Sequence, residues 1–69
     1  MIRKRSVTLS GHRTSVSVED EFWAELKAIA AAEKRSVTDV LTELDAARGG
    51  NLSSAVRLYV LKALKRGVA

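Results

Sequence analysis

The sequence predicts a mainly helical fold that contains one short β-strand and is completed by a second copy of the chain. Residues 14–18 alternate between small polar side chains and valine, which is the period of a half-buried strand. Three helix-like stretches follow this segment, and none of them offers a partner strand. The chain has 69 residues and no cysteine, so a small core must gain stability by association rather than through disulfides.

The predicted strand has two chemically different faces. Val16 and Val18 lie on one face and suit a core, whereas Arg13, Ser15 and Ser17 lie on the other. One face is therefore expected to pack on the helices, and the other is expected to be exposed and basic at one end.

The first 11 residues have two interpretations, which the sequence leaves open. Residues 5–9 also alternate, and residues 10–11 could turn them into a local hairpin with the next strand. The alternative is a basic arm that becomes ordered only on a partner. We therefore divide the chain into residues 1–11, an arm or short strand, and residues 12–69, the main domain.

Three helices are predicted after the strand. The first begins in the acidic run 19–21, where negative charge suits a helix N-terminus, and ends near residues 33–35. The second begins at the Ser-x-x-Asp sequence of residues 36–39 and stops at Gly49-Gly50. The third begins at residues 51–54 and is apolar over more than half its circumference, so we expect it to pack on its own chain and on a partner chain. The residues expected in the core or the dimer interface are Val16, Val18, Phe22, Trp23, Leu26, Ile29, Val40, Leu41, Leu44, Val56, Tyr59, Val60 and Leu64.

Charge is segregated along the chain. Residues 1–18 contain four basic residues and no acid, residues 19–47 contain eight acids and three bases, and residues 48–69 contain five bases and no acid. Basic ends of this kind are an electrostatic footprint for nucleic acid, although ordinary solvated charge gives the same pattern.

Catalytic, metal-binding and membrane functions are disfavoured by the residues present. With one histidine and no cysteine a zinc site is nearly excluded, and no glycine-rich phosphate loop occurs. No segment approaches the ~20 apolar residues that span a membrane, and no signal-peptide core follows the basic start. We therefore expect a cytoplasmic protein that is not an enzyme and that uses no cofactor or metal.

The polar face of the strand carries side chains that can read DNA. A pair of antiparallel strands fits the major groove, serine can bond to several bases, and arginine pairs well with guanine. We therefore expect Arg13, Ser15 and Ser17 to contact bases. The simplest partner for the strand is the same strand of a second copy, paired across a two-fold axis.

The order of a strand, an acidic-start helix and a serine-initiated helix resembles the ribbon-helix-helix DNA-binding proteins of the Arc/MetJ type, in particular a bacterial subgroup. The resemblance rests on residues 13–18, 19–33 and 35–41, and covers residues 12–47. It implies an intertwined homodimer with an intermolecular two-stranded antiparallel ribbon. It also implies that the C-terminal helix is extra to the minimal fold.

The resemblance further implies that the N-terminus of the second helix holds a DNA phosphate. The usual glycine before that helix is replaced by Lys34-Arg35. Residues 51–56 could instead be the family's second-helix start, and then Ser53 and Ser54 would make the contacts; the short loop at residues 34–35 favours the first alignment. The phosphate contacts assigned in that alignment are Lys34, Arg35, Ser36, Val37 and Thr38, with Arg5 in addition.

The resulting hypothesis is a sequence-specific transcriptional regulator, a repressor, that binds double-stranded DNA as a homodimer and associates with the bacterial nucleoid. Higher-order assembly on DNA is left open. The alternative is a dimeric interaction module, such as an antitoxin or adaptor without direct DNA readout, whose acidic middle faces a basic partner. DNA binding that weakens steeply with salt distinguishes the two.

Overall fold

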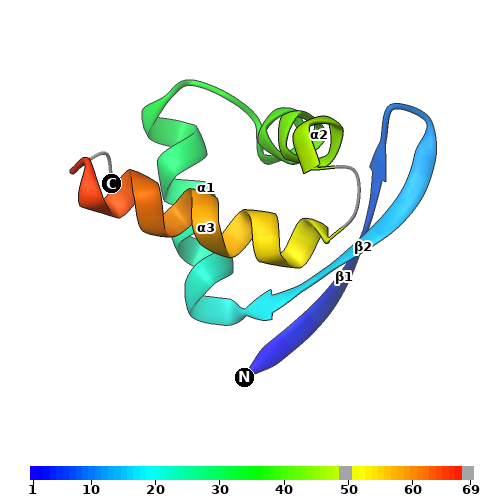
Figure 1. Cartoon of the computed structure of the whole chain (residues 1–69), viewed down its shortest axis with the longest axis horizontal. Coiled ribbons are helices and arrows are strands. Elements are labelled where there is room, and N and C mark those ends of the chain that lie inside the picture. The colour runs from blue at the N-terminus through cyan, green and yellow to red at the C-terminus, as the bar shows by residue number, and fades with distance from the viewer. Residues whose placement is uncertain (49–50, 68–69) are drawn as a thin grey trace.

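A β-hairpin packs against three helices in the computed structural model of this chain (Figure 1). The structure describes residues 1–48 and 51–67, so the helix stop predicted at Gly49-Gly50 lies outside the described residues. The elements in chain order are β1 (Ile2–Leu9), β2 (His12–Glu19), α1 (Asp20–Ala32), α2 (Val37–Arg48) and α3 (Leu52–Lys65).

The hairpin corrects the prediction of one short strand. β1 and β2 are each eight residues long and pair antiparallel, from Leu9 opposite His12 to Ile2 opposite Glu19. Ser10 and Gly11 join them with φ values of 51° and 84°. Two successive positive φ angles give a two-residue turn whose twist matches that of the strands. β2 therefore has a partner within its own chain, and the paired strand extends beyond the alternating residues 5–9 back to Ile2.

The first helix ends in a hydrogen-bonded motif that reverses the chain direction. The Arg35 N–H donates to the Ala30 carbonyl at 2.9 Å, and the Lys34 N–H donates to the Ala31 carbonyl at 3.0 Å. Lys34 has a φ of +57°. This is a Schellman motif, in which the residue with positive φ is usually glycine.

Side-chain caps start the other two helices where the sequence places capping residues. The Ser36 hydroxyl accepts a hydrogen bond from the Asp39 N–H at 3.0 Å, at the start of α2. The Asn51 side chain accepts one from the Ser54 N–H at 3.0 Å, at the start of α3. Each cap satisfies a backbone donor that the helix cannot satisfy internally.

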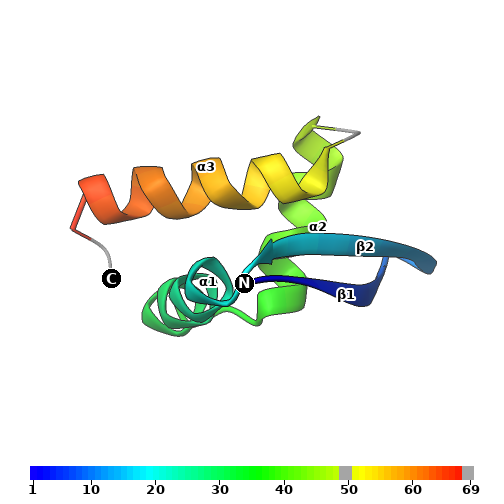
Figure 2. The ribbon, with the colours of Figure 1, turned by 90° about the horizontal axis from the view of Figure 1, so that it is seen from below.

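The core lies between the inward face of the hairpin and the helices, and α3 runs on the β2 side of the hairpin (Figure 2). Among the described residues no polar or charged residue is buried. Of the residues expected in the core or interface, four pack against it half-buried (Phe22, Trp23, Leu44 and Tyr59) and Leu64 is 44% exposed. The others are buried: Val16, Val18, Leu26, Ile29, Val40, Leu41, Val56 and Val60.

Candidate nucleic-acid interface

The hairpin has one face that is open to solvent except near Ser17 and Glu19, where α3 contacts it, and we call this face the outer face. The strand register places alternate residues of both strands on it, because side chains directly opposite in an antiparallel pair point to the same side. At about 3.3 Å per residue, each strand presents this face over roughly 26 Å. The outer face consists of Ile2, Lys4, Ser6 and Thr8 from β1 and Arg13, Ser15, Ser17 and Glu19 from β2.

The three residues predicted to contact bases share the outer face. Arg13 and Ser15 are exposed, and Ser17 is half-buried. Each lies opposite a polar residue of β1: Thr8 faces Arg13, Ser6 faces Ser15, and Lys4 faces Ser17.

The β1 half of the outer face was missed by sequence reasoning. Lys4, Ser6 and Thr8 are exposed, and they widen a single polar row into a two-stranded surface. The alternation of residues 5–9 carried this signal for Ser6 and Thr8, since Val7 and Leu9 mark the inward positions. No ion pair engages Lys4 or Arg13 within the described residues.

Arg5 lies on the opposite, inward face of the hairpin. Its guanidinium carbon is 4.4 Å from the centroid of the Trp23 ring, and its Nη2 donates to Asp20 Oδ1 at 3.3 Å. Only 21% of the side chain is exposed. These contacts tie Arg5 to α1 through a cation–π contact and an ion pair, and they hold it away from the outer face.

The start of α3 is bonded directly to β2. The Ser17 N–H donates to the Ser53 hydroxyl at 2.9 Å. One turn further on, the Arg57 side chain donates to Glu19 Oε1 at 3.1 Å and to the Ser17 carbonyl at 3.4 Å. β1 occupies one edge of β2, and α3 occupies the other edge around Ser17.

The start of α2 is held by contacts within the helical part of the chain. Arg35 forms ion pairs with Glu43 at 2.8 Å and with Glu33 at 3.6 Å. Lys34, Ser36 and Thr38 are exposed and Val37 is half-buried. The described hydrogen bonds do not join this helix start to the hairpin, whereas they do join the start of α3 to it.

Glu19 is the single acid on the outer face, and Arg57 compensates it. A hydrogen bond from its own backbone N–H, followed by the Arg57 contacts, lowers the pKa of the Glu19 carboxyl despite partial desolvation. The carboxylate thus stays ionised and paired at neutral pH. The unpaired charge on the outer face is positive, from Lys4 and Arg13.

The part of the chain that the structure describes offers neither a metal site nor a membrane span. There, no group of three or more His, Cys, Asp or Glu side chains could hold a metal ion. None of the described helices is long and apolar enough to cross a membrane.

Comparison with known proteins gives one match. A family model described as the ribbon-helix-helix domain matches residues 2–64. Searches of curated proteins and of solved structures found no match. The matched range includes β1 and all but the last residue of α3, so it gives no support to the expectation that α3 is an addition to the family's fold. With the matched range spanning the hairpin and all three helices, this chain belongs to the ribbon-helix-helix family, whose members are in general DNA-binding regulators or antitoxins.

Proposed function

We propose that this protein is a sequence-specific DNA-binding regulator, a repressor, that inserts the outer face of its hairpin into the major groove. One observation carries the proposal. The hairpin packs one face on the helices through Leu9, Val16 and Val18, and six of the eight residues on its outer face are serine, threonine, lysine or arginine. A two-stranded antiparallel ribbon is one of the elements that the major groove admits.

Base contacts are proposed for Arg13, Ser15 and Ser17, together with Lys4 and Ser6 from the opposite strand. Arginine and lysine match the acceptors of guanine, and serine can bond to several bases. Arg5 is left out of the proposed contacts, because Trp23 and Asp20 already engage its guanidinium.

Phosphate contacts have two candidate sites. The first is the start of α2 with the loop before it, residues 34–38, where the Lys34, Ser36 and Thr38 residues are exposed beside a helix N-terminus, a position that suits an anion. The second is the start of α3 at Ser53 and Ser54. The hydrogen bond from Ser17 to Ser53 holds this helix start beside the hairpin, where a phosphate that flanks the major groove would lie.

If the first site is used, Lys34→Ala should weaken binding and lower the salt slope by about one unit, because a cation that neutralises a phosphate is lost. If the second site is used, Ser54→Ala should weaken binding with little change of the slope, because serine carries no charge.

The protein is proposed to act as a homodimer on double-stranded DNA in the bacterial nucleoid. The ribbon need not be shared between subunits, since each chain already holds a complete two-stranded hairpin. An intertwined ribbon would require β2 to pair with a strand of the second copy. To do so, β2 would have to give up its pairing with β1 on one edge or its hydrogen bond to α3 on the other.

The test is in-vitro selection of bound DNA from a random pool, followed by titration of the enriched sequence and a scrambled control at several salt concentrations. A symmetric enriched motif, bound more tightly than the control, is expected. Binding to both DNAs should weaken with salt, because phosphate contacts release counterions. A pool that shows no enrichment would overturn sequence-specific readout.

The second candidate function is an interaction module, such as an antitoxin or adaptor. The observation that favours it is the exposure of three leucines on α3, Leu58, Leu61 and Leu64. Selection without enrichment, together with a tight complex with a second protein, is the result expected for this candidate.

A further inference from the structure

One exposed face of α3 combines two leucines with two lysines. Leu58, Leu61, Lys62 and Lys65 are all exposed. Their spacing of three and four residues places them together on the helix surface, and we call this group the α3 face. Leu58 and Leu61 are 41% and 48% exposed. Single exposed leucines are ordinary on a protein surface, whereas a contiguous apolar patch marks an interaction site.

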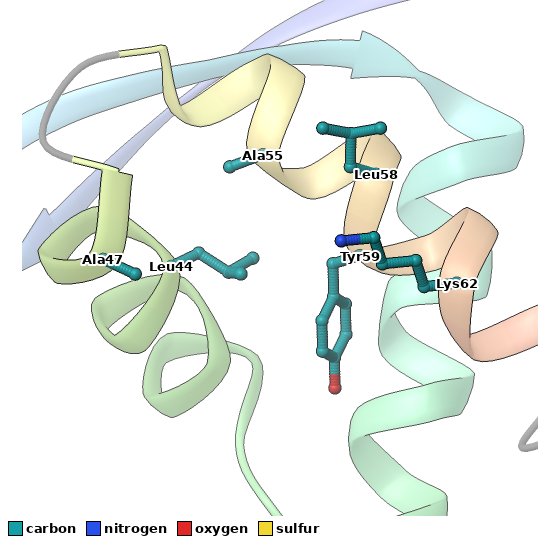
Figure 3. A pocket seen from close by; sticks show the side chains of 6 residues that line it. All are labelled: Leu44, Ala47, Ala55, Leu58, Tyr59 and Lys62. Atoms are coloured by element: carbon teal, nitrogen blue, oxygen red, sulfur yellow. The ribbon is translucent and has the colours of Figure 1, made fainter.

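An apolar hollow between α2 and α3 extends this patch (Figure 3). Leu44 and Ala47 line the hollow from α2, and Ala55, Leu58 and Tyr59 line it from α3. Its volume of about 180 Å³ is close to the roughly 150 Å³ of a cavity that admits benzene, so it can take one leucine or aromatic side chain. Lys62 is the one charged side chain in the lining. Because Leu58 and Lys62 belong to both features, the α3 face and the hollow form one continuous surface.

The charge of this surface is positive. Among the described residues no ion pair engages Lys62 or Lys65, and α3 contains no acid. On α2, Glu43 is already paired with Arg35 at 2.8 Å, so it does not neutralise these lysines. A second copy docked by the same surface would bring lysines against lysines, and like charges at an interface oppose binding. The surface therefore suits an anionic partner rather than a copy of itself.

Three kinds of molecule offer negative charge: nucleic acid, an anionic membrane and an acidic protein segment. A DNA backbone has no apolar side chain with which to fill the hollow. A membrane-surface helix inserts its apolar face among the lipids, whereas the apolar side of α3 already packs in the core of this chain. An acidic amphipathic helix supplies both an apolar anchor and carboxylates, and the docking of such a helix on an apolar surface is a recurring mode of recognition.

We propose that the α3 face and the hollow bind an acidic amphipathic helix of another protein. One leucine or aromatic side chain of that helix fills the hollow beside Leu58. Carboxylates three or four residues from this anchor lie on the same side of the partner helix, where they pair with Lys62 and Lys65. The proposal goes beyond DNA readout by the hairpin and does not depend on it.

The first experiment is selection of peptides from a displayed random library on the immobilised full chain, without DNA. The enriched peptides should contain a leucine or aromatic residue with aspartate or glutamate three or four positions away. A library that shows no enrichment, or enriched peptides without an excess of acidic residues, overturns the proposal.

The second experiment locates the site by fluorescence anisotropy, with the most enriched peptide carrying the label. Leu58→Gln and Lys62→Glu should each raise the dissociation constant by about tenfold or more. Both residues are exposed, so the variants should keep the circular dichroism spectrum of the wild type.

Two matched variants control for general effects of polarity and charge. Ile2 is 57% exposed on the hairpin, and Lys27 is exposed on α1 and does not line the hollow. Ile2→Gln and Lys27→Glu make the same chemical changes as the two site variants, and they should leave the dissociation constant nearly unchanged. Equal weakening by Lys27→Glu and Lys62→Glu would mean that the peptide follows net charge alone, which overturns the proposal.

A last measurement tests the membrane as the occupant. The full chain is sedimented with vesicles of phosphatidylserine and phosphatidylcholine, and Leu58→Gln should make no difference to the bound fraction. Vesicle binding that Leu58→Gln abolishes would assign the surface to lipid and overturn the proposal. Because none of these measurements contains DNA, their failure leaves the selection test of DNA readout unaffected.

Discussion

The Ser53 hydroxyl lies 2.9 Å from the Ser17 backbone nitrogen, and this hydrogen bond joins the start of α3 to the edge of β2 that β1 does not occupy. A strand edge carries free backbone donors that can template pairing with other chains. At Ser17 the chain satisfies that donor itself, with a side chain from far along the sequence. The same bond fixes the start of α3 beside the outer face.

Replacing Ser53 tests this link. Ser53→Ala should lower the free energy of unfolding by about 1–2 kcal/mol, because it leaves a partly buried N–H without a partner. The measurement is urea denaturation. Ser54→Ala is the control, since no hydrogen bond of its hydroxyl occurs among the described residues, and it should change stability by less than about 0.5 kcal/mol. Equal effects of the two variants would show that the Ser17 bond is not the cause.

The sequence carries enough information for the helices and for one face of the ribbon. Apolar spacing placed Leu26 and Ile29 on the buried side of α1, and alternation placed Ser15 and Ser17 opposite Val16 and Val18. These periods are local, so a single sequence shows them.

The first strand was harder to predict, for physical reasons. Arg3, Lys4 and Arg5 look like a solvated arm, and only the fold shows that Trp23 and Asp20 receive the inward-facing Arg5. The turn uses Ser10 at positive φ, where Asn or Gly would have been a clearer signal. The position of Lys4 on the outer face could not be predicted, because it depends on the register of the two strands, and the turn at residues 10–11 sets that register.

The backbone at Lys34 should tolerate glycine better than lysine. Lys34 has a φ of +57° at the end of α1, a conformation that glycine adopts without steric cost. Lys34→Gly should raise the free energy of unfolding by about 0.5–1 kcal/mol. Lys34→Ala, which removes the charge but not the steric cost, should give no such gain. Thermal denaturation of the two variants beside the wild type makes the comparison.

Tyr59 links α3 to the end of α1 through its hydroxyl, which donates to Glu33 Oε1 at 2.8 Å. Burial, and then this hydrogen bond, raise the pKa of the Tyr59 phenol. At pH 7, Tyr59→Phe should lower the free energy of unfolding by about 0.5–1.5 kcal/mol.

The Tyr59 contribution should also depend on pH in the alkaline range. Because the folded state holds the phenol proton more tightly, the contribution is complete below the unfolded tyrosine pKa of about 10 and is lost as pH rises through the folded value. The difference in the free energy of unfolding between the wild type and Tyr59→Phe should therefore become smaller above about pH 10. A difference that is constant across this range would contradict the assignment.

Two arginines of the hairpin offer a matched test of which face meets DNA. Arg13 is exposed on the outer face and makes no ion pair in the described part of the chain, whereas Arg5 is engaged by Trp23 and Asp20 on the inward face. Arg5→Gln should lower the free energy of unfolding by about 1–2 kcal/mol and leave DNA affinity nearly unchanged. Arg13→Ala should leave the free energy of unfolding nearly unchanged and weaken DNA binding.

For Arg13→Ala, the expected loss is about 1–3 kcal/mol of binding free energy on the selected DNA, with relaxed base preference at one position. The reason is that a guanidinium reaching a base edge contributes to specific binding alone, whereas a phosphate contact contributes to binding of any sequence. Titrations on selected and scrambled DNA over several salt concentrations separate the two roles. Equal weakening on both DNAs, with a salt slope lower by about one, would make Arg13 a phosphate anchor. No change on either DNA would mean that the hairpin stays out of the groove, and the interaction-module function would then be the better account of the exposed leucines on α3.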